Sequence, residues 1–233
     1  MIIHINKTIG ETPNDLIERF RRENPDFINE KISFAGRLDP MASGAMILLT
    51  GNDCKSQPHF ISLKKTYRFK CILGITTDTF DILGIPNLVP VSLIKSTFNL
   101  KPQKFSQEFP IYSSRVVNGH PLWWWAKQNR INEIVIPNKE CEIYSVINMG
   151  LKIVHSELLL NDIITRILKL PKERFKGFRV EEIVSSWKKM LENIEKLFVI
   201  GEYEISVSSG TYIRGICNSL GGTAMDIHRV SFD

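Results

Sequence analysis

Segments with the two-residue period of a β-strand and segments with the 3.6-residue period of an α-helix are interleaved along this chain. Lys65–Leu73 (KTYRFKCIL) alternates and is rich in aromatic and β-branched residues, as a half-buried strand requires. Val180–Phe198 instead places apolar residues at i, i+3, i+4 and i+7, which predicts a long amphipathic helix. This mixture excludes an all-helical or all-β fold and predicts a single α+β or α/β domain.

Shorter segments support the same reading. Thr12 and Pro13 form a helix start, as N-cap and first helical residue, and Leu16, Ile17 and Phe20 continue one apolar face to about Arg22. A second helix is expected from an Asn161 cap to Leu170, ahead of Pro171. Four further strands are expected: Met1–Asn6, Ala45–Thr50, Glu140–Ile147 and Glu202–Ser208.

Composition narrows the class of protein. The 233 residues are 43% hydrophobic and 24% charged, which excludes a disordered chain and allows a sizeable core. No apolar run is long enough to span a membrane, and the N-terminus does not resemble a signal peptide. The four cysteines are dispersed, so we expect no zinc site or disulfide framework, and a cytoplasmic location. The net charge of +5 allows a nucleic-acid partner without requiring one.

The densest cluster of residues that could carry chemistry is Gly36–Gly44 (GRLDPMASG). Asp39 precedes a proline and is flanked by glycines, so we expect it in a constrained loop that leads into a buried strand. Such loops often hold catalytic carboxylates, but an Asp-Pro pair can equally well do no more than shape a turn.

A second cluster is Ser208–Gly215, which reads as a strand-to-helix turn capped by Thr211. Arg214 would then lie in the first helical turn, where its guanidinium could pair with a carboxylate or phosphate, or simply be solvated. Tyr67, on the expected strand Lys65–Leu73, is by pattern alone a core or half-buried aromatic residue.

Taken in order, these clusters resemble the TruB family of RNA pseudouridine synthases. The family's motifs are matched by NKTIGETP from Asn6, by GRLDPMASG from Gly36 and by KTYRFKCILGITTDTFDILG from Lys65. Further matches are YSSR from Tyr112, with Gly119, Leu122 and Ala126 after it, then SGTYIR from Ser209 and IHR from Ile227. Six ordered matches from residue 6 to residue 229 are more specific than any one of them.

The resemblance implies roles for individual residues. Asp39 would be the catalytic carboxylate, Tyr67 the residue stacked on the target base, and Arg214 the ion-pair partner of Asp39. Ile227 would line the uracil pocket, and Lys7 and Arg115 lie in motifs that the family uses to bind its substrate. The isomerisation needs no metal or organic cofactor, because a carboxylate can serve as nucleophile or base.

The chain departs from the family pattern at several places. Phe34 stands where the bacterial pattern has a histidine near the flipped base, and Arg37 gives an Arg-Leu-Asp string known from another pseudouridine synthase family. Trp123–Trp125 cannot all share one helix face, so at least one should be exposed. An exposed Trp could stack on an unpaired base, or the three could serve in core packing or protein contact.

Residues from about 158 to 195 exceed what the family needs and include a basic connector, Lys169–Arg179. We expect a helical insertion that either extends the RNA surface or forms a solvated face. The chain stops soon after the IHR match, so a single catalytic domain over residues 1–233 without a C-terminal PUA domain is expected. The expected sheet is mixed and mainly antiparallel, with flanking helices.

The function that follows is isomerisation of uridine in a structured RNA, most directly position 55 in the T-arm of tRNA, with no obligate protein partner. Two alternatives stay open. One is a non-catalytic RNA-binding or RNA-folding protein on the same scaffold. The other is a synthase that acts on another RNA, including one guided by partner proteins and a guide RNA.

Overall fold

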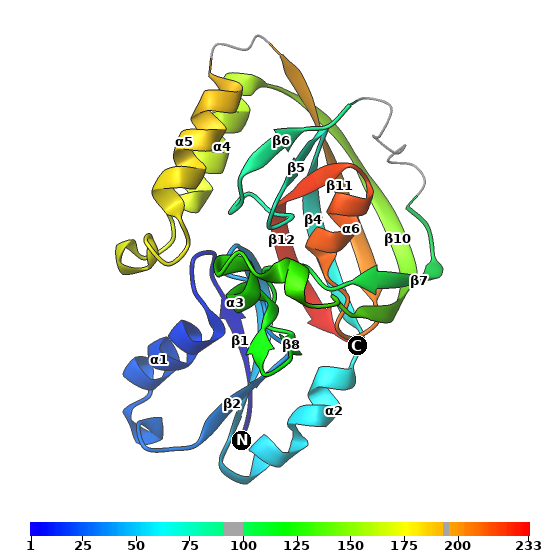
Figure 1. The fold of residues 1–233 in the computed structure, drawn as a ribbon. Coiled ribbons are helices and arrows are strands. Elements are labelled where there is room, and N and C mark those ends of the chain that lie inside the picture. The colour runs from blue at the N-terminus through cyan, green and yellow to red at the C-terminus, as the bar shows by residue number, and fades with distance from the viewer. Residues whose placement is uncertain (91–99, 193–195) are drawn as a thin grey trace.

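The central feature of the fold is one large, strongly twisted β-sheet (Figure 1). A computed structural model of the chain describes residues 1–90, 100–192 and 196–233. Within these residues the sheet has eight strands in the order β1-β3-β12-β4-β11-β10-β7, with β2 paired to β3. The strands are β1 (Ile2–Lys7), β2 (Ile32–Ala35), β3 (Ala42–Thr50), β4 (Lys65–Leu73), β7 (Gln103–Glu108), β10 (Asn138–His155), β11 (Leu197–Val207) and β12 (Gly222–Phe232).

The sheet is mixed and mainly antiparallel, as predicted. Only β12 and β3 are paired in parallel; the other pairs of this sheet are antiparallel. The helices are α1 (Pro13–Glu23), α2 (Gln57–Ser62), α3 (Leu122–Lys127), α4 (Ser156–Ile167), α5 (Val180–Leu191) and α6 (Ile213–Ser219). Two small hairpins complete the fold, β5 (Ile75–Thr77) with β6 (Pro86–Leu88) and β8 (Val116–Val117) with β9 (His120–Pro121).

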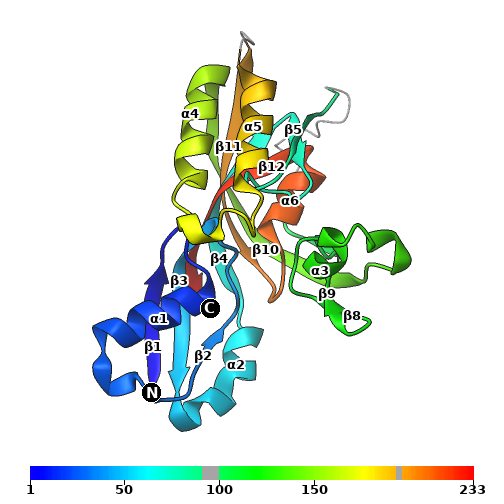
Figure 2. The same cartoon turned by 60° about the vertical axis from the view of Figure 1, so that its left-hand side comes forward.

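Helices cover both faces of the sheet. Cys71 and Ile72 are neighbours in β4 and therefore point to opposite faces. Cys71 belongs to the core formed with α1 and α6, whereas Ile72 belongs to the core formed with α4 and α5. Figure 2 shows the α4–α5 pair rising alongside β11, with α3 and the β8–β9 hairpin projecting on the other side. In the described part of the chain, no helix has the length and apolar character needed to cross a lipid bilayer.

Several predicted elements have the bounds expected. β4 coincides with the predicted strand Lys65–Leu73, and α1 begins at Pro13. Thr12 caps α1 through a capping box with Asp15: the Asp15 backbone N–H donates to Thr12 Oγ1, and the Thr12 backbone N–H donates to Asp15 Oδ2 at 2.8 Å. Strands β10 and β11 both extend beyond the predicted segments.

Three boundary predictions are wrong. Helix α4 starts at Ser156, not at an Asn161 cap, because strand β10 runs directly into it. Helix α5 ends at Leu191, and Leu197 and Phe198 belong to β11; residues 193–195 lie outside the described residues. Thr211 does not cap α6. Its hydroxyl donates to Ser208 O at 2.9 Å instead, and Tyr212 is the N-cap residue.

Candidate active site

The loop that carries Asp39 lies where strand β3 changes its partner. On one edge of β3, residues 47–50 pair with β2, and residues Ala42–Gly44 pair with Ile227–Arg229 of β12. Residues 36–41 leave the sheet between these two pairings. Gly44 makes the parallel contact possible: its φ is +106°, and a Cβ there would overlap the backbone of Arg229. The topology therefore sets Asp39 beside β12.

Two buried cations hold this loop at both ends. Arg229 donates from Nη2 to Gly36 O at 2.9 Å and from Nε to Ala45 O at 2.7 Å. On the other side, Lys7 Nζ donates to Thr8 O and Glu11 O at 2.9 and 2.7 Å, and more weakly to Pro40 O. Together the two side chains fix the backbone on either side of Asp39.

Lys7 is buried in the fold, and its assignment as a substrate contact stays a prediction. Its side chain is 1% exposed, and burial lowers its pKa to about 8 although Glu11 and Asp39 favour the charged form. Its ammonium is turned toward the backbone carbonyls of Thr8, Glu11 and Pro40, which accept its hydrogen bonds. Lys7 therefore supports the loop from beneath.

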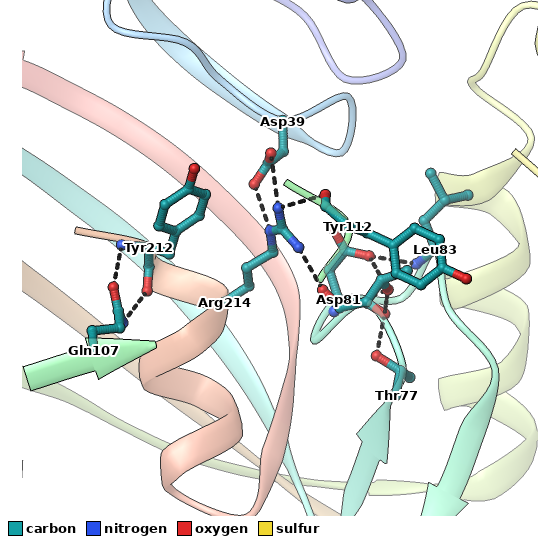
Figure 3. A network of polar contacts seen from close by, with 9 residues as sticks. Asp39, Thr77, Asp81, Leu83, Gln107, Tyr112, Tyr212 and Arg214 are labelled. Carbon is teal, nitrogen blue, oxygen red and sulfur yellow. Dashed lines mark hydrogen bonds and ion pairs between the residues drawn. The ribbon is translucent and has the colours of Figure 1, made fainter. Parts of the chain in front are cut away.

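Arg214 joins Asp39 to two neighbouring segments (Figure 3). Its Nε donates to Asp39 Oδ2 at 2.8 Å and its Nη2 to Asp39 Oδ1 at 3.4 Å. The remaining donors reach Thr79 O at 2.8 Å and Tyr112 O at 3.1 Å. Arg214 is 2% exposed. Burial opposes its charge, but Asp39 and Asp81 outweigh burial and raise its pKa. The solvated alternative for Arg214 is therefore wrong.

A second carboxylate, Asp81, lies behind Arg214. Its Oδ1 accepts from Thr79 Oγ1 at 2.8 Å and from the Leu83 backbone N–H at 2.9 Å. Figure 3 shows the contact with Leu83. Burial raises the pKa of Asp81 to about 6, and the positive charge of Arg214 limits that rise. Arg214 thus interacts with two carboxylates: Asp39, which is partly exposed, and Asp81, which is buried.

Most of the sequence-predicted site residues share one cavity of about 660 Å³. Its walls include Asp39 on the loop, Tyr67 on β4 and Ile227 on β12. Phe34, Arg37 and Arg115 line it too. Arg37 lies 5.6 Å from the ring centroid of Phe34, and Arg115 lies 5.1 Å from that of Phe109. Lys7 and Arg214 are outside this lining, and Arg214 contacts two residues that belong to it, Asp39 and Tyr212.

Several further lining residues were not predicted. Three of them, Arg229, Lys65 and Tyr212, lie inside the motifs that resemble the family. The sequence therefore marked these positions but did not indicate what each residue does. Burial lowers the pKa of Lys65 to about 8, with Arg229 and Lys139 adding to the effect. Lys139 on β10 also lines the cavity, and no local pattern in the sequence marks it.

Tyr212 is held by Gln107, another residue without a sequence signal. The side-chain amide of Gln107 donates to Tyr212 O at 2.9 Å and accepts from Tyr212 N at 2.8 Å. This two-bond clamp fixes the start of α6, two residues before Arg214 (Figure 3). Burial, together with Asp39, raises the pKa of Tyr212. The phenol therefore stays neutral beside the cavity.

The chemistry available here is that of a positioned carboxylate. Asp39 can act as nucleophile or as base, and Arg214 fixes the orientation of its oxygens. Over the ranges that the structure describes, no three His, Cys, Asp or Glu side chains converge in a way that could hold a metal ion.

Comparison with known proteins identifies the family. Residues 26–160 match the family model described as TruB family pseudouridylate synthase (N terminal domain). A protein named tRNA pseudouridine synthase B from Clostridium kluyveri is 29% identical over 99% of this chain and 66% of its own length. Its namesake from Caldicellulosiruptor saccharolyticus is 34% identical over 62% of this chain and 50% of its own length. The chain thus spans between one half and two thirds of these relatives.

Solved structures agree on the fold. A chain in the structure of an H/ACA ribonucleoprotein bound to a substrate RNA containing 2′-deoxyuridine aligns with a TM-score of 0.52 at 13% identity. The alignment covers 99% of this chain and 47% of that one. A Cbf5-Nop10-Gar1 complex aligns equally well. At this identity the likeness concerns the fold alone, but the family model covers more than half of the sequence. The chain belongs to the TruB family of pseudouridylate synthases.

Proposed function

We propose that this protein isomerises uridine to pseudouridine in a structured RNA, with position 55 in the T-arm of tRNA as the target. The observation that carries the proposal is the pairing of Asp39 with the buried Arg214 at the wall of a cavity that also contains Tyr67 and Ile227. Family membership supplies the reaction, and the names of the relatives supply the RNA.

The reaction fits a site with one reactive carboxylate. Isomerisation breaks the N1–C1′ glycosidic bond, turns the base and forms a C5–C1′ bond. C5 then loses its proton and N1 gains one, so that the product is an isomer of the substrate. No electrons are gained or lost overall. Asp39 would act at the sugar, either adding to C1′ or removing a sugar proton.

The cavity supports base recognition. A base inside an RNA fold must leave its stack before C1′ becomes accessible, and an apolar, aromatic pocket compensates for the lost stacking. Tyr67 and Ile227 offer such walls on adjacent strands. Phe34 can stack but cannot donate or accept a hydrogen bond through its ring, so it would serve as a wedge.

Two arginines in the cavity lining would bind the phosphates of the RNA backbone. Arg37 and Arg115 line the same cavity as Asp39, and an arginine suits a phosphate because its guanidinium presents two parallel donors. We propose that the chain recognises tRNA without an obligate protein partner. All four cysteines are free thiols, in keeping with the predicted cytoplasmic location.

The test is to incubate the purified protein with unmodified tRNA transcripts and to map pseudouridine at each uridine. We expect one modified site in the T-arm, and none when uridine 55 is replaced by cytidine. Asp39→Asn should bind the same tRNA and form no pseudouridine, while Asp26→Asn, an exposed carboxylate on another loop, should match the parent.

Two results would count against the proposal. Absence of isomerisation on every tRNA and on total cellular RNA would exclude the activity. Turnover that survives in Asp39→Asn would exclude Asp39 as the catalytic group.

A further inference from the structure

A second cavity, of about 540 Å³, lies on the other side of the Asp39 loop. It shares Arg37, Leu38, Asp39 and Ser114 with the first cavity, so the two meet at the reactive carboxylate. Part of its wall comes from the connector, Lys169–Arg179, which lies between α4 and α5. The connector belongs to the predicted insertion, and no part of the proposed mechanism uses it.

The connector is fastened to three separate elements. Arg174 forms a salt bridge with Asp15 of α1. Arg179 Nη2 pairs with Asp78 Oδ2 at 2.7 Å. The carbonyl of Gly177 accepts from Lys127 Nζ of α3 at 2.6 Å. Figure 2 shows the connector at the lower end of α4 and α5, directly above α1. These contacts make the second cavity a built feature of the fold.

Arg179 also links the connector to the active site. Its φ of +56° is a left-handed conformation that non-glycine residues adopt rarely and at a cost. In this conformation its guanidinium lies 4.9 Å from the ring centroid of Tyr112. The carbonyl of Tyr112 accepts from Arg214, which holds Asp39. The connector is therefore linked to Asp39 by way of Tyr112 and Arg214.

Five cationic side chains line the second cavity together with three carboxylates, those of Asp39, Asp81 and Glu173, so the cations are in excess. Arg174, Arg179 and Arg214 are each paired with an aspartate. Arg37 and Lys127 form no salt bridge with any residue that the structure describes. Burial and the nearby Arg179 lower the pKa of Lys127, so this part of the cavity would favour an added anion.

An aromatic ring lies beside these unpaired cations. Trp123 lines the cavity and is 40% exposed, and Lys127 Nζ lies 5.4 Å from its ring centroid. Trp124 and Trp125 do not line either cavity; Trp124 stacks on His120 with centroids 4.0 Å apart, and Trp125 is buried. Of the three consecutive tryptophans, Trp123 alone combines cavity lining with this exposure.

An anion site next to an exposed aromatic ring has the chemistry of a nucleotide site. Because both cavities share Arg37 and Asp39, a nucleotide in the second cavity would be a direct neighbour of the one that reacts. We propose that the second cavity binds the nucleotide adjacent to the target uridine, its base stacked on Trp123 and its phosphate held by Lys127 and Arg37. This inference rests on the proposed function for the identity of the RNA.

The experiment measures RNA binding separately from turnover. Asp39→Asn protein is titrated with a T-arm stem-loop and with two copies that carry an abasic nucleotide 5′ or 3′ of the target. We expect one of the two abasic positions to weaken binding about tenfold, the loss typical of one base–aromatic stack. Adding Trp123→Ala should weaken binding of the intact stem-loop about tenfold and remove any further effect of the abasic position.

Matched variants separate stacking from folding and charge. Trp124→Ala removes the same type of side chain outside both cavities and should keep the abasic effect. Trp123→Phe should restore most of the affinity, because it retains a stacking ring. Lys127→Gln should reduce the slope of log affinity against log salt by about 0.7, while Lys188→Gln, an exposed lysine of α5, should not.

A Trp123→Ala protein that still shows the full abasic effect would overturn the inference, as would equal effects of Trp123→Ala and Trp124→Ala. Failure of the proposed function has a different signature. In that case the wild-type protein forms no pseudouridine in the stem-loop, whatever the variants do to binding.

Discussion

Arg214 shows how much one side chain contributes to the candidate site. Its N–H groups donate hydrogen bonds to three acceptors: the carboxylate of Asp39, Thr79 O and Tyr112 O. The loop with Asp39, the segment with Thr79 and the segment before α3 are far apart in sequence, and all three contact this guanidinium. A lysine has one nitrogen and cannot reproduce that fork.

We therefore expect Arg214→Lys to lower kcat about 100-fold by letting Asp39 shift, with a much smaller change in KM. Single-turnover and steady-state assays on the T-arm stem-loop would measure both constants. Arg68→Lys is the matched control, because Arg68 pairs with Glu204 on the exposed sheet surface. Equal kcat values for Arg214→Lys and Arg68→Lys would contradict the positioning role.

Asp81 should make stability depend on pH. Burial raises its pKa from 3.8 to about 6, so between these values the native state binds more protons than the unfolded state. Stability then falls as pH rises through this window, by up to about 3 kcal/mol. Asp81→Asn cannot ionise and should lose this component, while its Oδ1 can still accept from Thr79 and Leu83.

Urea unfolding of both proteins at pH 4 and pH 7 checks this expectation. As pH rises, the free energy of unfolding of Asp81→Asn should increase relative to that of the wild type. Asp26→Asn serves as the exposed control and should follow the wild type. Parallel pH curves for wild type and Asp81→Asn would show that Asp81 carries no such penalty.

The residues of the site were predictable to different degrees. Asp39 and Arg214 lie in short motifs with a recognisable order, so their pairing could be expected from the resemblance. Lys7 has the same kind of motif, but the sequence does not show that its ammonium is turned inward. Gln107 and Lys139 are paired on strands β7 and β10, and only the tertiary register brings Lys139 to the cavity and Gln107 to the backbone of Tyr212.

At the scale of elements, local pattern predicted β4 and α1 well because their periodicity and capping agree with their tertiary setting. It failed where two elements adjoin without a turn. Strand β10 passes into α4 at His155–Ser156, and no capping side chain marks the change. A second boundary was wrong for a different reason: apolar spacing continues from α5 toward Leu197, yet pairing with β10 makes Leu197 part of a strand.

Helices α4 and α5 share a hydrophobic core with the sheet. Substitution of Trp187 tests how much this packing contributes to stability. Trp187 of α5 is fully buried, and its Nε1 donates to Ile82 O at 3.0 Å, next to Asp81. Trp187→Phe leaves that carbonyl without its donor and should cost about 1–3 kcal/mol. Trp187→Ala should cost about 3–5 kcal/mol.

Urea unfolding followed by circular dichroism would measure both losses. Leu158→Ala, at an exposed position of α4, should change stability by no more than about 0.5 kcal/mol. A single transition is expected for every variant. Two separate transitions, with only the first moved by Trp187→Ala, would mean that the pair folds as an appendage.

At the scale of the whole molecule, the net charge of +5 should make RNA binding sensitive to salt. The connector contributes exposed cations at Lys172 and Lys176, whereas Arg174 is already paired with Asp15. That the surrounding segment, 158–195, is an insertion used for RNA binding stays a prediction. The structure narrows its test to these two lysines.

We expect Lys172→Glu combined with Lys176→Glu to weaken tRNA binding and to flatten its salt dependence by a slope of about 1.4 or more. Binding measured between 50 and 200 mM salt would give the slope. The control is Glu181→Lys combined with Glu182→Lys at the start of α5, which changes the net charge in the opposite direction. An unchanged affinity and slope in the lysine variant would identify the connector lysines as a solvated face.

The place of β12 between β3 and β4 has a consequence for the order of folding. Arg229 pairs with Gly44 on one side and with Tyr67 on the other, so this strand closes the sheet between two segments far earlier in the chain. Contacts of such long sequence separation form late and slowly. Helices and hairpins can thus be present while the Asp39 loop still lacks its contact with Arg229. Recovered isomerase activity during refolding would report closure of the sheet, and it would lag behind the recovery of secondary structure.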